Sequence, residues 1–399
     1  MIIREYITCE TCDKHYRVRV QVGLRKVQQH IFHCVECKES IKLRLEIGVG
    51  LSPIQNCRII PQDDEALSFY LSPDFVASAG EIHDPNSFPS FNFMRELSRA
   101  VEGVKIPSEA RTIEAAHRHP TWHIDEIWAD IQKAWRLHDA GQYAIANRIL
   151  KKLAAENEIE GTGLPYIQFF LIESMIKSDS SLIDELAIIK NLNEKEFFRF
   201  VSYYQRVFKK NHSASLYSIL GDFFAAFDDF TQVALYMRNG TFPPEQAHAT
   251  SVNFDSVKGF YAKCYEFFAG AISIYTCLNN IKQGRPFDRL AHISLDKYLT
   301  TDKAERRKSI ENNPVFFAAS HEFDSNIRNA AYHDWFKLRA SKQEIDYRSG
   351  GTGQLRTISY AAYLYQCSIL LAQACRLFTI ELVLDDYARR VALVTKAAT

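Results

Sequence analysis

The ten residues Asp324-Ser325-Asn326-Ile327-Arg328-Asn329-Ala330-Ala331-Tyr332-His333 decide the fold expected for the C-terminal part of this chain. Their alanine-rich filling favours a helix. Arg328 and His333 stand five positions apart in the run, and Asn329 directly follows the arginine. At about 100° per residue, Asn329 and His333 lie on one face of such a helix. Arg328 and His333 are separated by about 140° around the helix axis and would lie on the two sides of a groove.

The same spacing of arginine and histidine occurs at two other places, and neither fits a helix as well. Arg25 and His30 lie between the two arms of a cysteine motif, and the span from Arg118 to His123 contains Pro120, which would break a helix. Only Arg328 has asparagine next to it in an apolar helical neighbourhood. This pattern, Arg-Asn-x3-His on a late helix, resembles the HEPN family, many of whose members are metal-independent ribonucleases.

The resemblance implies a chemical role for each motif residue. An imidazole titrates near neutrality, so His333 would move protons at a ribose 2′-hydroxyl and a leaving 5′-oxygen. The guanidinium of Arg328 would bind the phosphate oxygens, and Asn329 would orient either partner. RNA would be cut to 2′,3′-cyclic phosphate and 5′-hydroxyl ends without a catalytic metal. Tyr332, Lys337 and Arg339 are the candidate substrate-binding residues.

The family resemblance also implies a biological setting. Two copies of the bundle would pair as a homodimer, and the protein would act in host defence or toxin-type growth arrest, with a regulatory protein or a phage-derived component as its trigger. The residues alone leave a second interpretation open, in which Arg328 is a surface arginine and His333 packs a helix. The protein would then be a binding or scaffolding protein without activity.

The sequence around the motif predicts a helical bundle. The turn Ser349–Gly353, between Lys337–Arg339 and Arg356–Ile358, predicts a short β-hairpin inserted among the helices. The run from Ser359 to Leu384 is apolar enough to raise the question of a membrane span, but it contains Gln366, Gln373, Arg376 and Glu381. We therefore expect a central buried helix and no membrane. Residues 256–281 repeat apolar side chains at helical spacing and supply a partner, so the domain covers residues 241–399.

The N-terminal residues 1–50 carry a second motif, Cys9-x2-Cys12 followed by Cys34-x2-Cys37. This spacing predicts a structural zinc ion held by four thiolates. Each pair leads into a stretch of alternating polar and apolar residues, His15–Val22 and Ile41–Ile47, which predicts a small β zinc ribbon. His15, His30 and His33 are alternative ligands. With nine basic and six acidic residues, the ribbon favours contact with protein or structural capping over nucleic-acid binding.

The middle of the chain is predicted to be helical. Residues 51–110 mix strand-like stretches, Cys57–Ile60 and Leu67–Leu71, with loops and are expected to form a mixed connector. Residues 111–240 are expected to be a helical domain, since Ala134–Ala144 resembles the turn of a tetratricopeptide unit. His117, His119 and His123 form a local cluster that is a weak candidate for metal binding.

Charge and cysteine content complete the sequence-based expectations. The net charge is zero, but residues 241–399 hold twenty basic and sixteen acidic groups, which suits binding to RNA. Five further cysteines are scattered through the chain, and no secretory signal opens it, so we expect a reduced, cytoplasmic protein. The expected fold class is mainly α: a C-terminal HEPN-like bundle with a β-hairpin insertion, a helical middle and an N-terminal zinc ribbon.

Overall fold

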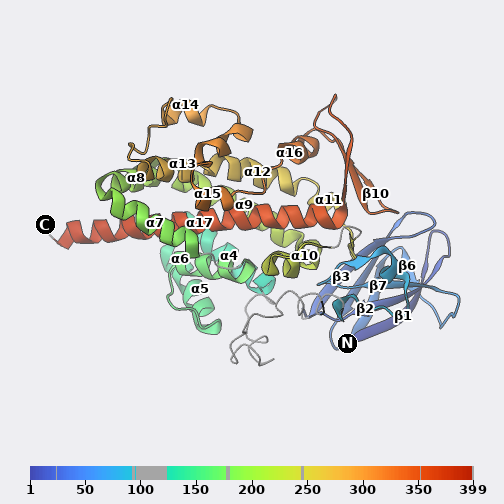
Figure 1. Cartoon of the computed structure of the whole chain (residues 1–399). Helices are drawn as coiled ribbons and strands as arrows, with labels where there is room; N and C mark the ends of the chain where they lie inside the picture. Colours follow the sequence, from blue (N-terminus) through green and yellow to red (C-terminus); the bar gives the residue numbers. More distant parts are fainter. Residues whose placement is uncertain are drawn as a thin grey trace. The chain divides into compact units, whose positions relative to one another are not determined.

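The computed structural model describes residues 1–23, 25–91, 95, 124–176, 180–243, 247–350 and 352–397 (Figure 1). Helices fill the middle and C-terminal parts of the described chain, and strands dominate its N-terminal part, which confirms the mainly α class with a small β region. Contacts divide the chain into two compact units. Unit 1 comprises Met1–His123, Ala225–Gly259 and Asn329–Ser368, and unit 2 comprises Ile124–Phe224, Phe260–Arg328 and Ile369–Thr399.

The β region of unit 1 contains two sheets. One has the strand order β6-β1-β2-β7 and the other the order β3-β4-β5. Their strands are β1 (Ile2–Cys9), β2 (His15–Gln21), β3 (Val27–His33), β4 (Ser40–Glu46), β5 (Gly50–Gln55), β6 (Cys57–Ile59) and β7 (Leu67–Leu71). Alternate residues of β2 and β4 are buried, as the sequence pattern predicted, and they join one apolar core that also includes Phe32 and Phe69. The strand-like stretches predicted after residue 50 are β6 and β7.

Unit 1 continues with short elements from three parts of the chain. They are β8 (Ala77–Ser78), α1 (Ala79–His83), α10 (Phe227–Asn239), β9 (Ala247–His248) and α11 (Phe254–Val257), followed by β10 (Phe336–Arg339), β11 (Glu344–Tyr347) and β12 (Arg356–Ser359). The last three form a sheet of their own, so the predicted hairpin is a three-stranded insertion. The unpredicted strand is β11, in which Ile345 and Tyr347 are buried while Glu344 and Asp346 alternate with them.

Unit 2 is built from helices. They are α4 (Ile124–Asp139), α5 (Tyr143–Glu156), α6 (Leu164–Met175), α7 (Ser180–Leu192), α8 (Glu194–Val207), α9 (Lys209–Ala225), α12 (Phe260–Ala271), α13 (Ser273–Lys282), α14 (Leu295–Leu299), η3 (Lys303–Ile310) and α15 (Pro314–Ala318). Helices α4 and α5 pack on each other across a turn in which Gly141 has a φ of +76°. That left-handed conformation suits glycine and closes the helix pair predicted from Ala134–Ala144.

The longest helix is α17 (Tyr360–Ala397), drawn in red in Figure 1. By length and composition it could cross a membrane, but 72% of its apolar window is buried inside the protein. The side chains of two of its polar residues have partners, whereas the Gln366 Oε1 and Arg376 Nε atoms have no hydrogen-bond partner among the described residues. The side-chain amide of Gln373 accepts from the N–H of Glu322 and donates to the carbonyl of the same residue. The buried Glu381 accepts from the hydroxyl of Tyr204 at 3.1 Å. These features are those of a core helix, as predicted.

Candidate functional site

The four N-terminal cysteines form a compact cluster in unit 1. Their sulfur atoms all lie within 4.8 Å of one another, with 3.7 Å between Cys9 and Cys37 and 3.5 Å between Cys12 and Cys34. Among the residues that the structure describes, no other group of histidines, cysteines and carboxylates comes together in this way. The cysteines are therefore close enough to bind one metal ion.

The two cysteine turns have the same backbone geometry. The N–H of Cys9 donates to the Lys14 carbonyl at 2.9 Å, and the N–H of Asp13 donates to the Cys9 carbonyl at 2.9 Å. The second turn has the two equivalent hydrogen bonds. The N–H of Cys34 donates to the Glu39 carbonyl at 2.9 Å, and the N–H of Lys38 donates to the Cys34 carbonyl at 3.1 Å.

The residue after each pair is held in the left-handed region, with a φ of +58° at Asp13 and +66° at Lys38. Residues other than glycine adopt this backbone conformation at a cost of about 1–2 kcal/mol. Its presence at the same position in both turns indicates that each turn is shaped to bring its paired sulfurs together.

The surroundings of Cys34 favour a thiolate. Tyr16 is fully buried and donates its hydroxyl to the Cys34 sulfur at 3.1 Å, while the N–H of Val35 donates to the same hydroxyl at 2.8 Å. Burial raises the pKa of Cys34, but the bonds from Tyr16 and from backbone N–H groups outweigh it and lower the pKa to about 7. At Cys37 a backbone bond lowers the pKa, but burial and the neighbouring sulfurs outweigh it and raise the pKa to about 12. All four sulfurs can therefore be thiolates only with a cation among them, and the donor set fits a bound metal.

The alternative histidine ligands lie outside the cluster. His15 contacts Asp63 at 2.5 Å, and His33 contacts the Lys38 carbonyl at 3.1 Å. His30 is fully buried, and burial lowers its pKa to about 4. The cluster of His117, His119 and His123 lies outside the described residues.

The Arg-Asn-x3-His motif lies on α16 (Ser325–Tyr332) and the turn that ends it. The boundary between the two units falls between Arg328 and Asn329. In unit 2, the Nε atom of Arg328 lies 3.3 Å from a carboxylate oxygen of Glu266, and its guanidinium lies 5.3 Å from the ring centre of Tyr265. The contact with Glu266 is an ion pair without a hydrogen bond, because the buried Nε of Arg328 has no hydrogen-bond partner among the described residues.

In unit 1, the helix ends at the histidine. The N–H of His333 bonds the carbonyl of Asn329 at 3.1 Å, Asp334 has a φ of +55°, and the N–H of Trp335 returns to Ala330 at 3.0 Å. This left-handed residue stops the helix and leaves the imidazole of His333 exposed at its C-terminal end. The side chain of Asn329 donates to the hydroxyl of Ser349 at 3.0 Å.

Two exposed aromatic rings flank this histidine. Tyr332 is 63% exposed and Trp335 is 36% exposed, and the guanidinium of Arg348 lies 5.0 Å from the centre of the Trp335 ring. Such a ring suits stacking with an unpaired base. Tyr332 was predicted from the sequence as a substrate-binding residue, whereas Trp335 was not, although it stands only two residues after the motif histidine.

The two basic candidates on β10 differ in their surroundings. Arg339 contacts Glu344 at 2.8 Å and Asp346 at 2.9 Å, so its charge is already balanced within the sheet. Lys337 is exposed and stands opposite Asp346 in the strand register, but that carboxylate bonds Arg339 and Thr357 instead. Lys337 is therefore the better placed of the two to bind a phosphate.

No family model, curated protein or solved structure matches this chain. The resemblance to the HEPN family thus rests on the motif and on the helical context around it.

Proposed function

We propose that this protein is a metal-independent endoribonuclease of the HEPN type, with Arg328 as its phosphate-binding residue and His333 as its proton-transfer residue. One observation carries the proposal. Arg328 forms an ion pair with Glu266 at 3.3 Å without a hydrogen bond from its Nε, and an exposed His333 follows five residues later, in the turn that ends α16. A guanidinium can present two parallel N–H groups to a phosphate, and the ion pair with Glu266 would restrict its position.

The proposed reaction uses only side chains. His333 removes the proton of a ribose 2′-hydroxyl, the resulting oxygen attacks the adjacent phosphorus, and the bond to the 5′-oxygen breaks. The leaving oxygen takes a proton, which gives a 2′,3′-cyclic phosphate on one product and a 5′-hydroxyl on the other. Arg328 stabilises the charge that grows on the phosphate oxygens, and Asn329, held by Ser349, keeps the end of the helix in place. DNA lacks the attacking hydroxyl and would not be cut.

A second copy of the chain would complete the site. One chain offers a single Arg328 and His333 pair, whereas the reaction needs a proton acceptor at the 2′-oxygen and a proton donor at the 5′-oxygen. A two-fold homodimer would supply one imidazole for each. A monomer that retains full activity in light scattering and cleavage assays at micromolar concentration would contradict this part of the proposal.

The cysteine cluster would hold a structural zinc ion. Four thiolates close the tetrahedral coordination of zinc and leave no position for a substrate. The ion would stabilise the N-terminal β region, where contact with another protein, including a phage-derived or regulatory trigger, is the favoured role. A cytoplasmic location and a role in host defence or growth arrest are parts of the same proposal.

A second candidate function is binding without catalysis. The contact between Arg328 and Glu266 favours it, because a partly buried ion pair is also an ordinary structural contact. The motif would then only hold α16 in place, and changes at His333 would leave the protein's effect intact.

Expression in cells separates the two functions. The wild type, Arg328→Ala, His333→Ala and the control His321→Ala would be induced at equal levels, followed by measurement of growth and total RNA. His321 is another exposed histidine, bonded to the Ala318 carbonyl, and lies outside the motif. The ribonuclease account predicts arrest and RNA loss with the wild type and the control only. Equal effects of all four proteins would favour the scaffold.

A further inference from the structure

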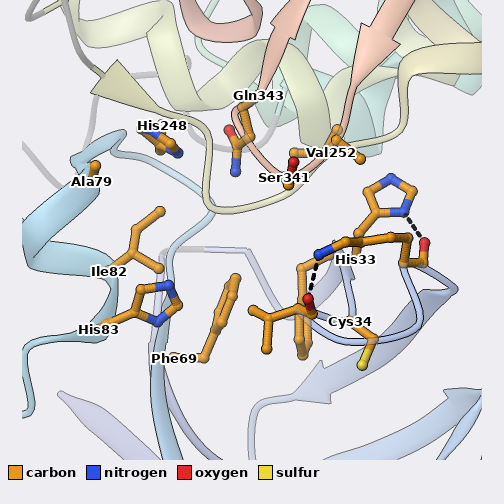
Figure 2. Close-up of a pocket in the computed structure, with 14 residues that line it drawn as sticks. His33, Cys34, Phe69, Ala79, Ile82, His83, His248, Val252, Ser341 and Gln343 are labelled. Atoms are coloured by element: carbon orange, nitrogen blue, oxygen red, sulfur yellow. Dashed lines mark hydrogen bonds between the residues drawn. The ribbon is translucent and has the colours of Figure 1, made fainter. Parts of the chain in front are cut away.

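Unit 1 contains a cavity of 320 Å³ that the sequence did not indicate. It is lined by the second cysteine turn, helix α1, strand β9 and the turn between β10 and β11, all of which belong to the same unit. Figure 2 shows Gln343 on one side of this space and Ile82, His83 and Phe69 on the other. The volume is at the small end of the range typical for sites that bind small molecules.

One side of the cavity is apolar and partly aromatic. Phe69 is stacked on Phe32 with ring centres 4.2 Å apart, and the ring of His83 meets Phe69 edge-on at 5.4 Å. Ile82 is 3% exposed and adds an aliphatic wall. A flat, apolar face of a ligand would be well accommodated there, because it would replace water against these side chains.

The opposite side carries a polar atom without a partner. Gln343 is only 8% exposed, and its Nε2 donates to the Ala249 carbonyl at 2.8 Å, which fixes the orientation of the amide. Its Oε1 is buried and has no hydrogen-bond partner within the described ranges. A buried acceptor left in this state costs about 1–3 kcal/mol, so it marks a position where a donor from a ligand would bind favourably.

The lining contains one lysine, Lys38, whose ammonium donates to the Val35 carbonyl and keeps its positive charge. Three histidines, His33, His83 and His248, also line the cavity, burial lowers the pKa of His248, and none of the lining residues is an aspartate or a glutamate. The three histidines are not close enough together to form a metal site, since the cysteine cluster is the only such group in the described chain. Cys34 of the cysteine cluster also lines the cavity, so Lys38 is the position in the lining that suits a phosphate.

We propose that this cavity binds a nucleotide, with the base against Phe69 and Ile82, a base N–H donating to Gln343, and the phosphate toward Lys38. A base is flat, offers N–H donors and carries a phosphate through its ribose, which matches the three features above. The nucleotide could be free or the end of an RNA strand, since both present the same chemistry. The site does not rest on nuclease activity.

Isothermal titration calorimetry on the full-length His333→Ala chain tests the proposal without RNA cleavage. The probes are the four ribonucleoside 5′-monophosphates, their nucleosides, inorganic phosphate and a short oligoribonucleotide. We expect saturable binding of at least one monophosphate and at least tenfold weaker binding by Gln343→Leu, about the effect of losing one good hydrogen bond. Competition by the oligoribonucleotide would assign the site to RNA, and its failure to compete would assign the site to free nucleotides.

Gln343→Leu could also weaken binding by disturbing the fold, so two further variants at exposed positions test the cavity separately. Ser341 lines the cavity and is exposed, so Ser341→Trp should block the entrance and abolish binding. Its exposed neighbour Lys342 does not line the cavity, so Lys342→Trp should bind as before. The absence of saturable binding for every probe, or unchanged binding by Ser341→Trp, would overturn the proposal.

Discussion

The Nε atom of Arg328 lies 3.3 Å from Oε1 of Glu266, and the other oxygen of this carboxylate accepts from Lys303 at 2.5 Å. The single negative charge of Glu266 therefore pairs with two cations, so Glu266, Arg328 and Lys303 together carry a net positive charge. The Arg328 and Glu266 side chains are 22% and 26% exposed, so their positions are restricted by packing, and solvent screens them only in part. We infer that Glu266 positions the guanidinium without neutralising it.

The first prediction concerns this carboxylate. Glu266→Gln keeps the shape of the side chain but removes the charge that holds Arg328, so RNA cleavage should slow by about tenfold, with the loss in kcat larger than the change in KM. Glu305→Gln, at a carboxylate that pairs with Lys308 on the surface, is the control and should cleave normally. Faster cleavage by Glu266→Gln would mean that the carboxylate competes with the phosphate.

The second prediction separates the basic residues of β10. Lys337→Ala should weaken binding of single-stranded RNA and reduce the slope of log K against log salt by about 0.7, the value for one lost phosphate contact. Arg339→Ala should leave the slope unchanged, because Glu344 and Asp346 already balance that arginine. Fluorescence anisotropy at several salt concentrations, in the His333→Ala background, measures both. Equal slopes for all proteins would exclude Lys337 from the RNA-binding surface.

The third prediction is one zinc ion per chain. Elemental analysis should find it in the wild type and in Cys57→Ala but not in Cys9→Ser. Cys57 is a matched control, since it is buried and lies opposite Cys9 in the strand register but is not part of the cluster.

Tyr16→Phe should keep the zinc ion but bind it about 10- to 100-fold more weakly, because the Cys34 sulfur loses the hydroxyl that orients it. Competition with a chelating dye measures this change. Zinc retained by Cys9→Ser at the level of the wild type would contradict the assignment of the four ligands.

The fourth prediction concerns the pH dependence of stability. Burial raises the pKa of Glu322 from 4.5 to about 7, even though Tyr261 donates a hydrogen bond to it at 2.8 Å. Between these two pH values the folded protein holds a proton that the unfolded chain releases. The contribution of Glu322 to the free energy of unfolding is therefore fully present below about pH 4.5 and is lost as the pH rises through about 7.

Glu322→Gln cannot ionise and keeps an oxygen that accepts from Tyr261. It should match the wild type at pH 4 and exceed it at pH 8 by on the order of 1–3 kcal/mol. Urea unfolding followed by circular dichroism, at both pH values, measures the difference. A constant difference between the two proteins would show that Glu322 does not titrate in this range.

The elements that local patterns determine were predicted well. Strands β2 and β4 follow from alternation, α17 follows from a long apolar run with a few polar residues, and the cysteine spacing predicted a cluster that the structure brings together. Each of these features depends on residues within one short stretch of the chain. The pairing of β2 with β7, which is parallel and joins distant segments, has no such local signal.

The surroundings of the motif could not be predicted for the same reason. Glu266 and Tyr265 come from α12, far from Arg328 in the sequence, and only the packing of unit 2 brings them next to the arginine. The bond from Asn329 to Ser349 depends on the inserted sheet. The cavity at Gln343 is lined by residues from five separate stretches of the chain, so no spacing in the sequence indicates it.

The most direct test of the account is cleavage of an end-labelled single-stranded RNA by the purified protein in EDTA, applied briefly enough to leave the structural metal in place. The account predicts cleavage by the wild type to 2′,3′-cyclic phosphate and 5′-hydroxyl ends. It also predicts a rate at least about a hundredfold lower for each of Arg328→Ala and His333→Ala, with a smaller loss for Asn329→Ala. A requirement for magnesium, 5′-phosphate ends, or undiminished cleavage by His333→Ala would contradict it.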